Sequence, residues 1–199
     1  MEFFGLDLVA VIKAIGYSGL FAVVFAETGL FLGFFLPGDS LLFVAGMLAG
    51  QQFFSLPVLI VGLFVSAVLG NVLGYEFGRR IGPKLFSRED SLIFKKAHAI
   101  KAQGFYDKHG PKMILLARFM PIVRTFAPIV AGVAKMHYRT FFIYNLIGAL
   151  LWTIGLVILG YSLGSVMDVD KYLLPIILLI VFLSFLPGII AYVREKRSA

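Results

Sequence analysis

Cysteine is absent from the 199-residue chain, which excludes disulfides, thiol chemistry and thiolate metal sites. Charged residues are scarce, at 15% of the chain against about 25% in an ordinary soluble domain. Tryptophan occurs once, and Trp152 falls inside a long apolar run, so we expect it to pack against neighbours and not to anchor a membrane interface.

Apolar residues, in contrast, are abundant. They make up 60% of the chain, and the mean hydropathy is +0.94. A soluble protein of this length has no interior large enough to bury so many apolar side chains, so the sequence predicts an all-α polytopic membrane protein. Soluble enzymes and disordered scaffolds are excluded. The pI of about 9.7 indicates basic loops at a membrane surface, and no nucleic-acid partner is expected.

Three apolar runs, with Glu76 as their single charged residue, are long enough to cross a bilayer, which takes about 20 helical residues. They lie near residues 56–78, 140–163 and 172–193. The acidic N-terminal segment lacks the positive stretch of a signal peptide, and we expect it to be retained.

Basic residues collect between these runs and fix the expected topology. Residues 79–112 hold nine Lys and Arg against three Asp and Glu, and residues 194–197 are also basic. The positive-inside rule therefore places the 79–112 loop and the C-terminus in the cytoplasm. Two crossings, 140–163 and 172–193, already connect these cytoplasmic segments. The apolar stretch 113–134 is then expected to dip into the membrane and return, as a re-entrant hairpin broken near Pro121.

The N-terminal half has a similar pattern. Shifting it by about 86 residues places 27–50 on 113–136 and aligns Gly78 with Gly164, with Pro37 near Pro121. The sequence thus predicts an inverted repeat with two opposed re-entrant hairpins, a common transporter plan. Pro37 and Gly38 are expected to break the first hairpin. An ordinary span over 17–36 followed by a short surface helix remains open, as does the side of the N-terminus.

This pattern divides the single expected membrane domain, residues 1–199, into four parts. They are a first repeat over 27–78, the basic loop 79–112, a second repeat over 113–164 and a C-terminal transmembrane helix over 172–193. Glycines recur every fourth residue at the end of the first repeat, at Gly70, Gly74, Gly78 and Gly82. We expect this stripe to admit a closely packed helix, because no strand precedes it as a dinucleotide site requires.

Four ionisable residues interrupt the apolar segments: Glu27, Asp39, Arg118 and Arg124. Each costs about 2.5–3.5 kcal/mol at the centre of a membrane helix on insertion scales, so intramembrane charges indicate function by default. Their charges sum to zero, and we expect them to meet in one polar cavity. The structural alternative is a pair of buried salt bridges that only joins the hairpins, but buried ion pairs contribute little stability.

The residue types indicate the chemistry of this cavity. Arg118 and Arg124 carry planar guanidinium groups that bind phosphate through paired hydrogen bonds. Glu27 and Asp39 would repel phosphate when ionised, and we expect them to act as proton carriers or gates. No cofactor and no metal are expected, since His98, His109 and His137 lack metal-ligand spacing. We expect no enzyme activity.

At these residues the sequence resembles the DedA family of bacterial inner-membrane proteins, which share the VTT domain with eukaryotic lipid scramblases. The resemblance covers nearly the whole chain. It is carried by Phe25-Ala26-Glu27-Thr28-Gly29 with Phe35-Leu36-Pro37-Gly38-Asp39-Ser40-Leu41, by residues 70–82, and by Ala117-Arg118-Phe119-Met120-Pro121-Ile122-Val123-Arg124-Thr125-Phe126-Ala127-Pro128.

The resemblance implies a multi-pass protein of the bacterial inner membrane that moves lipids between leaflets. Family members resemble flippases that return undecaprenyl phosphate to the cytoplasmic leaflet, and others are associated with phosphatidylethanolamine. Coupling to protons is also implied, with functional acids matching Glu27 and Asp39 and functional arginines matching Arg118 and Arg124. Two rivals remain: a proton-coupled antiporter for small cations, and a structural protein that assembles envelope machinery. The oligomeric state, transport direction and coupling ion are left open.

Overall fold

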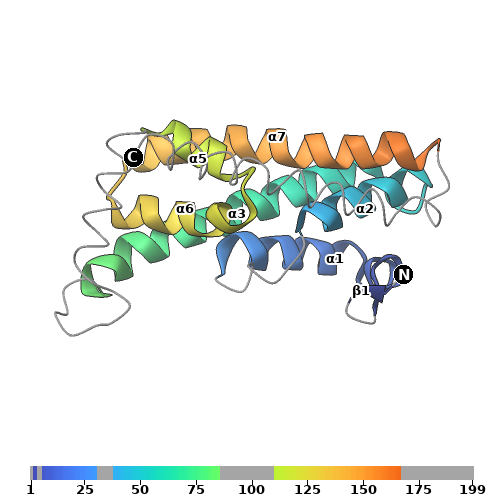
Figure 1. Ribbon diagram of the computed structural model, residues 1–199, viewed down its shortest axis with the longest axis horizontal. Helices are drawn as coiled ribbons and strands as arrows, with labels where there is room; N and C mark the ends of the chain where they lie inside the picture. Colours follow the sequence, from blue (N-terminus) through green and yellow to red (C-terminus); the bar gives the residue numbers. More distant parts are fainter. Residues whose placement is uncertain (1, 4–5, 31–37, 86–109, 167–199) are drawn as a thin grey trace, which may run out of the picture. The chain divides into compact units, whose positions relative to one another are not determined.

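Helices form nearly all of the described chain, which comprises residues 2–3, 6–30, 38–85 and 110–166 of a computed structural model (Figure 1). A ladder of two residues per strand, β1 (Glu2–Phe3) with β2 (Leu6–Asp7), precedes the helices. The helices are α1 (Leu8–Gly29), α2 (Gly38–Gly50), α3 (Leu56–Leu85), α5 (Lys112–Ala117), α6 (Pro121–Val133) and α7 (Tyr138–Gly164). The predicted all-α class is therefore confirmed for this part of the chain.

Within the described residues, three helices are long and apolar enough to cross a membrane: α1, α3 as far as Ile81, and α7. The runs predicted near 56–78 and 140–163 are confirmed as helices of membrane length. The span predicted over 172–193 lies outside the described residues, as do Pro37 and most of the loop 79–112.

One side of α3 exposes large apolar side chains along its whole length. Their exposed fractions run from 36% to 61%, and they recur every three or four residues at Val58, Val61, Val65, Leu69, Leu73, Phe77 and Ile81. Such a stripe on a helix of membrane length is matched to lipid and not to water. The protein is accordingly a membrane protein.

The chain forms two compact units, and each draws on both halves of the sequence. The first unit contains Met1–Val24, Phe35–Ser66 and Leu150–Ala199, and the second contains Phe25–Phe34 and Ala67–Ala149. Helices α1, α3 and α7 therefore each contribute a segment to both units. The boundaries predicted for the sequence repeats, 27–78 and 113–164, are not those of these units, and the repeat itself stays a prediction.

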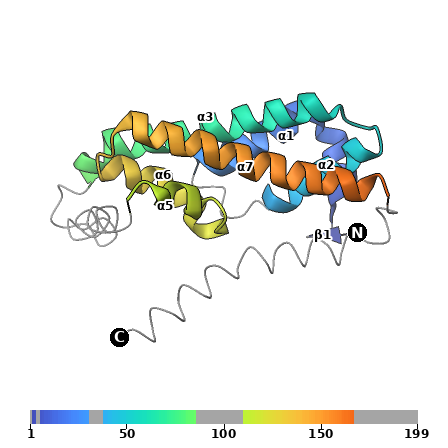
Figure 2. The same cartoon turned by 90° about the horizontal axis from the view of Figure 1, so that it is seen from above.

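In the first unit, α2 packs closely against the later part of α7 (Figure 2). A methyl group on Gly46 of α2 would overlap the carbonyl oxygen of Val157, and one on Gly160 of α7 would overlap that of Phe43. Helix α2 is buried along almost its entire length. The choice between a re-entrant hairpin and an ordinary span followed by a short helix at the membrane surface stays a prediction.

In the second unit, α6 packs against α3 in the same manner. A methyl group on Gly132 of α6 would overlap the Tyr75 carbonyl oxygen, and one on Gly78 of α3 would overlap that of Ile129. Gly70, two turns earlier on α3, leaves room for the end of α1 at Thr28. The predicted role of the glycine stripe in close helix packing is thus confirmed for Gly70 and Gly78.

Candidate functional site

A buried ion pair joins α1 to α6 in the second unit. Glu27 lies in the last turn of α1 and is fully buried, and Arg124 lies in the first turn of α6 with 7% of its surface exposed. The Arg124 Nη2 atom donates a hydrogen bond to Glu27 Oε1. Two of the four predicted charges are therefore direct partners, separated by 97 residues in the sequence.

Arg118 lies directly after α5 and is 3% exposed. Its Nη1 atom donates to Oδ1 of Asn145, at 2.9 Å, and Asn145 is a fully buried residue of α7. The Asn145 amide nitrogen in turn donates to the Val68 carbonyl oxygen of α3 at 3.2 Å. Gly148, one turn further along α7, leaves room for the arginine stem, since a methyl group there would lie 3.2 Å from Arg118 Cδ. Two membrane-length helices thus hold this guanidinium.

Asn71 of α3 lies beside Arg118 and Asn145. A guanidinium only donates hydrogen bonds, and one orientation of the Asn71 amide turns its oxygen toward Arg118. In that orientation the oxygen accepts from Arg118 Nη1 at 2.8 Å, and the amide nitrogen donates to the Thr28 carbonyl oxygen at 3.2 Å. In the other orientation of the same amide, the Asn71 nitrogen donates instead to Asn145 Oδ1 at 2.9 Å. A polar cluster of two arginines, one glutamate and two asparagines is therefore assembled from five helices of the second unit.

Sequence reasoning did not assign Asn71 or Asn145 to the site. Asn71 is part of a motif that carries the family resemblance, but the search for intramembrane charges does not identify it. The same search does not identify Asn145, because an asparagine side chain is neutral. A signal was present, however, since these are the only asparagines in the chain and each stands inside an apolar run of membrane length. An amide at such a position requires a polar partner.

A helical break brings both arginines to the cluster. Helix α5 ends at Ala117 and α6 begins at Pro121, with Met120 extended at φ −116° and ψ 109°. Proline suits the first position of a helix, because its missing N–H would have no helical partner there, and it disfavours helical geometry in the residue before it. The break predicted near Pro121 therefore falls immediately before this residue. In the first unit, Gly38 is the first residue of α2.

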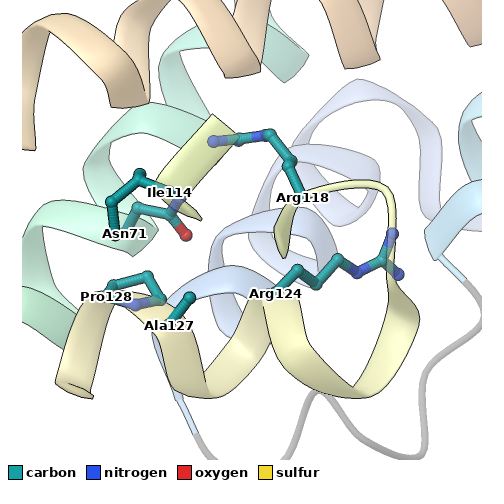
Figure 3. Close-up of a pocket in the computed structure, with 6 residues that line it drawn as sticks. All are labelled: Asn71, Ile114, Arg118, Arg124, Ala127 and Pro128. Carbon is teal, nitrogen blue, oxygen red and sulfur yellow. The ribbon is translucent and has the colours of Figure 1, made fainter. Parts of the chain in front are cut away.

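The cavity at the cluster is small and enclosed by Asn71, Ile114, Arg118, Arg124, Ala127 and Pro128. Figure 3 shows the Arg118 side chain leaving the end of α5 and the Arg124 side chain leaving the first turn of α6, and the two extend away from each other. The cavity volume is about 10 Å³, close to the space that one water molecule needs. In this conformation the site is closed, and a larger guest would require α5 and α6 to move.

Asp39 belongs to the first unit. It lies in the first turn of α2 and accepts a hydrogen bond from Trp152 Nε1 of α7 at 2.8 Å. A carboxylate is favoured there because the first turn of a helix carries a partial positive charge. The meeting of Asp39 with the other three charges in one cavity stays a prediction.

Metal ligands do not gather in the described part of the chain, where no three His, Cys, Asp or Glu side chains come together. His98 and His109 lie outside the described residues, and His137 is exposed at the start of α7. The described cluster offers guanidinium and amide groups, which bind anions and carbonyl oxygens.

Comparison with known proteins gives close relatives. Residues 36–162 match the VTT domain family. The chain is 47% identical to Protein DedA of Escherichia coli strain K12, over 97% of this chain and 89% of that protein. It is 43% identical to an uncharacterized membrane protein of Mycobacterium leprae, over 92% and 86% of the two chains. Inner membrane protein YqjA of Escherichia coli strain K12 is 36% identical over 82% and 79%. No solved structure matches.

Proposed function

Because the chain belongs to the DedA family of VTT-domain membrane proteins, we propose that it moves a phosphate-bearing lipid between bilayer leaflets in a process coupled to protons. Undecaprenyl phosphate is the proposed substrate, and the bacterial inner membrane is the proposed location. The basic loop 79–112 and the C-terminus are proposed to face the cytoplasm, as their charge indicates.

The observation that carries this proposal is the charge of the buried cluster. Within the described part of the second unit, the buried acidic and basic side chains are Glu27, Arg118 and Arg124. Two of these three groups are guanidinium groups, which stay protonated in an apolar environment. A phosphate oxyanion is a guest that matches the charge and the planar geometry of a guanidinium.

Glu27 supplies a route to proton coupling. Its carboxylate accepts from Arg124, so a lipid phosphate and Glu27 would compete for the same guanidinium. Protonation of Glu27 removes the competing negative charge and releases Arg124 for the phosphate. Lipid binding and proton uptake are then linked, and each favours the other.

Paired glycine contacts support the inverted repeat on which such a transporter would be built. The shift of about 86 residues places Gly46 on Gly132 and Phe43 on Ile129. Gly46 and Phe43 are the α2 positions that touch α7, while Gly132 and Ile129 are the α6 positions that touch α3. Corresponding positions of α2 and α6 therefore make the close helix contacts within each unit. The proposed hairpins, one ending in α2 and one formed by α5 and α6, would be opposed re-entrant elements.

Asp39 is proposed as a second proton gate. Its carboxylate is partly buried and accepts a hydrogen bond from an indole N–H, which adds no countercharge. Protonation of this carboxylate would release it from Trp152. Since this hydrogen bond joins α2 to α7, its loss would affect the packing of both helices.

Flipping of labelled polyprenyl phosphate in proteoliposomes tests the proposal. Arg118→Lys keeps the charge but loses the planar fork, and we expect flipping to fall by about tenfold. The matched control is Arg80→Lys, an exposed conservative exchange that should have no effect. Parallel assays with labelled phosphatidylethanolamine and with small cations separate the rivals. Cation uptake without lipid movement would support antiport, and normal flipping by Arg118→Lys would contradict phosphate binding.

A further inference from the structure

A second and much larger cavity lies in the second unit, where α6 turns into α7 beside the end of α3. Its volume is about 620 Å³, within the range of small-molecule sites. Tyr75 and Met136 form its buried part, with 1% and 3% of their surfaces exposed. The Tyr75 hydroxyl donates to the Met136 carbonyl oxygen, so these two residues form a fixed floor.

Basic side chains surround this floor. Arg79 of α3, Lys135 of the α6–α7 turn and Arg139 of α7 line the cavity and are exposed. Glu76 lies one turn before Arg79, and its Oε1 atom is 3.8 Å from Arg79 Nη1. Its Oε2 atom also pairs with Arg80 Nε. Three permanent positive charges therefore line the cavity, with one carboxylate beside them.

The backbone holds Lys135 in place. Its φ is +52°, and the next amide, that of Met136, donates to the Ala131 carbonyl oxygen at 3.0 Å. This arrangement closes the end of α6 with a left-handed residue. Lysine carries a steric cost there that glycine or asparagine would reduce. The charged side chain is thus presented from an ordered turn.

Aromatic and apolar residues extend from the cavity along α7. The Tyr138 ring lies 5.7 Å from the Tyr75 ring and 5.8 Å from that of Phe142. Ile143 and Ile147, four and eight residues after Arg139, are 46% and 45% exposed. Residues at this spacing share one helix face. A basic cavity with a tyrosine at its edge and an exposed apolar ridge beyond it is typical of a lipid headgroup site.

We infer that this cavity binds the phosphate-bearing headgroup of an anionic membrane lipid, whose acyl chains lie along the exposed face of α7. The recognised chemistry is a phosphate oxyanion on three basic side chains, and the apolar ridge favours a lipid over a free phosphate ion. The site is separate from the buried cluster, and its occupancy does not depend on transport.

Retention of phosphatidylglycerol by the purified full chain in neutral detergent, followed by native mass spectrometry, tests this inference. The cavity variant combines Arg79→Gln, Lys135→Asn and Arg139→Gln. The control combines Lys13→Gln, Arg80→Gln and Lys112→Gln, which remove the same charge from exposed residues outside the cavity. We expect the cavity variant to bind phosphatidylglycerol at least about tenfold more weakly than the wild type, and the control to stay within twofold of it.

A variant with Arg79→Lys and Arg139→Lys keeps the charge and should retain binding, which separates the loss of charge from misfolding. Equal weakening of the cavity and control variants would overturn the inference, because general surface charge would then explain binding. Undiminished binding by the cavity variant would overturn it as well. Phosphatidylcholine, a zwitterionic lipid, should not be retained selectively. Displacement of phosphatidylglycerol by millimolar inorganic phosphate would contradict the lipid assignment and identify a free phosphate site.

Discussion

Trp152 Nε1 donates a hydrogen bond to Asp39 Oδ1 at 2.8 Å, joining α7 to the first turn of α2 across 113 residues of sequence. The indole is 3% exposed, and it is the only tryptophan in the chain. An indole N–H is a donor only, so it donates to the carboxylate oxygen and holds Asp39 in place. The contact explains how a carboxylate predicted to be functional is kept inside an apolar unit.

The single indole makes this contact directly measurable. Asp39→Leu removes the acceptor and the charge next to Trp152, and we expect the fluorescence emission to move to shorter wavelength. Asp39→Asn keeps a carbonyl oxygen at the same place and should shift the emission much less. The test is emission spectroscopy of the purified protein in detergent. Identical spectra for the wild type and Asp39→Leu would contradict the contact.

The long apolar helices could be predicted because a helix that contacts lipid needs a long, uninterrupted run of apolar residues. A run of about 20 residues without charge, as over 140–163, is typical of a helix that crosses a membrane. The charged residues inside such runs were also identifiable, since each is costly to insert. Glu27, Arg118 and Arg124 are indeed buried.

The partners of these charges could not be predicted in the same way. Sequence patterns report that a residue is buried, but the atoms that compensate it come from distant positions. The expectation that charges would balance charges agrees with the pair of Glu27 and Arg124 but overlooked neutral partners. Arg118 is held by the amide of Asn145, and Asp39 by the indole of Trp152. Neither partner carries a charge that a count of acids and bases would reveal.

Asn145 is expected to be a positioning residue for Arg118. Asn145→Leu removes the acceptor of the guanidinium and the donor to Val68, and it should lower the free energy of unfolding by about 1–3 kcal/mol. Lipid flipping should fall with it, while Asn145→Asp, which keeps an acceptor, should recover part of the activity. Thermal unfolding in detergent and the liposome assay measure the two effects.

Thr153 provides the matched control, because it is also fully buried on α7. Among the described residues its hydroxyl has no hydrogen-bond partner. Thr153→Val should therefore leave stability and flipping unchanged. Equal losses in Thr153→Val and Asn145→Leu would mean that polarity on α7 matters in general and that Arg118 is not specifically positioned.

Glu27→Gln mimics the protonated acid that the proposed mechanism requires. The neutral amide no longer competes with a phosphate for Arg124, so binding of a short-chain lipid phosphate should become stronger and lose its dependence on pH. Transport driven by a proton gradient should be lost, because the exchangeable proton is gone. Equilibrium binding at several pH values and gradient-driven flipping test the two parts separately. Unchanged gradient-driven transport would rule out Glu27 as the proton carrier.

Helix packing through glycine leads to a prediction that is independent of transport. Gly46→Ala and Gly132→Ala each place a methyl group against a backbone carbonyl oxygen, that of Val157 in the first unit and that of Tyr75 in the second. Backbone cannot give way as a flexible side chain does, so the paired helices must separate. Overpacking of this kind costs about 1–3 kcal/mol, and each variant should show a lower midpoint of thermal unfolding in detergent.

Gly155→Ala is the control for these variants, since it lies on α7 and a methyl group there would meet nothing within 4 Å among the described atoms. Replacing glycine by alanine inside a helix normally favours the folded state by up to about 1 kcal/mol, so Gly155→Ala should raise the midpoint or leave it unchanged. If the three variants shift the midpoint alike, the cost comes from the loss of glycine itself and not from close helix contact. A selective loss at Gly46 and Gly132 would show that α2 and α6 depend on equivalent close contacts, as expected if the two halves of the chain share one packing plan.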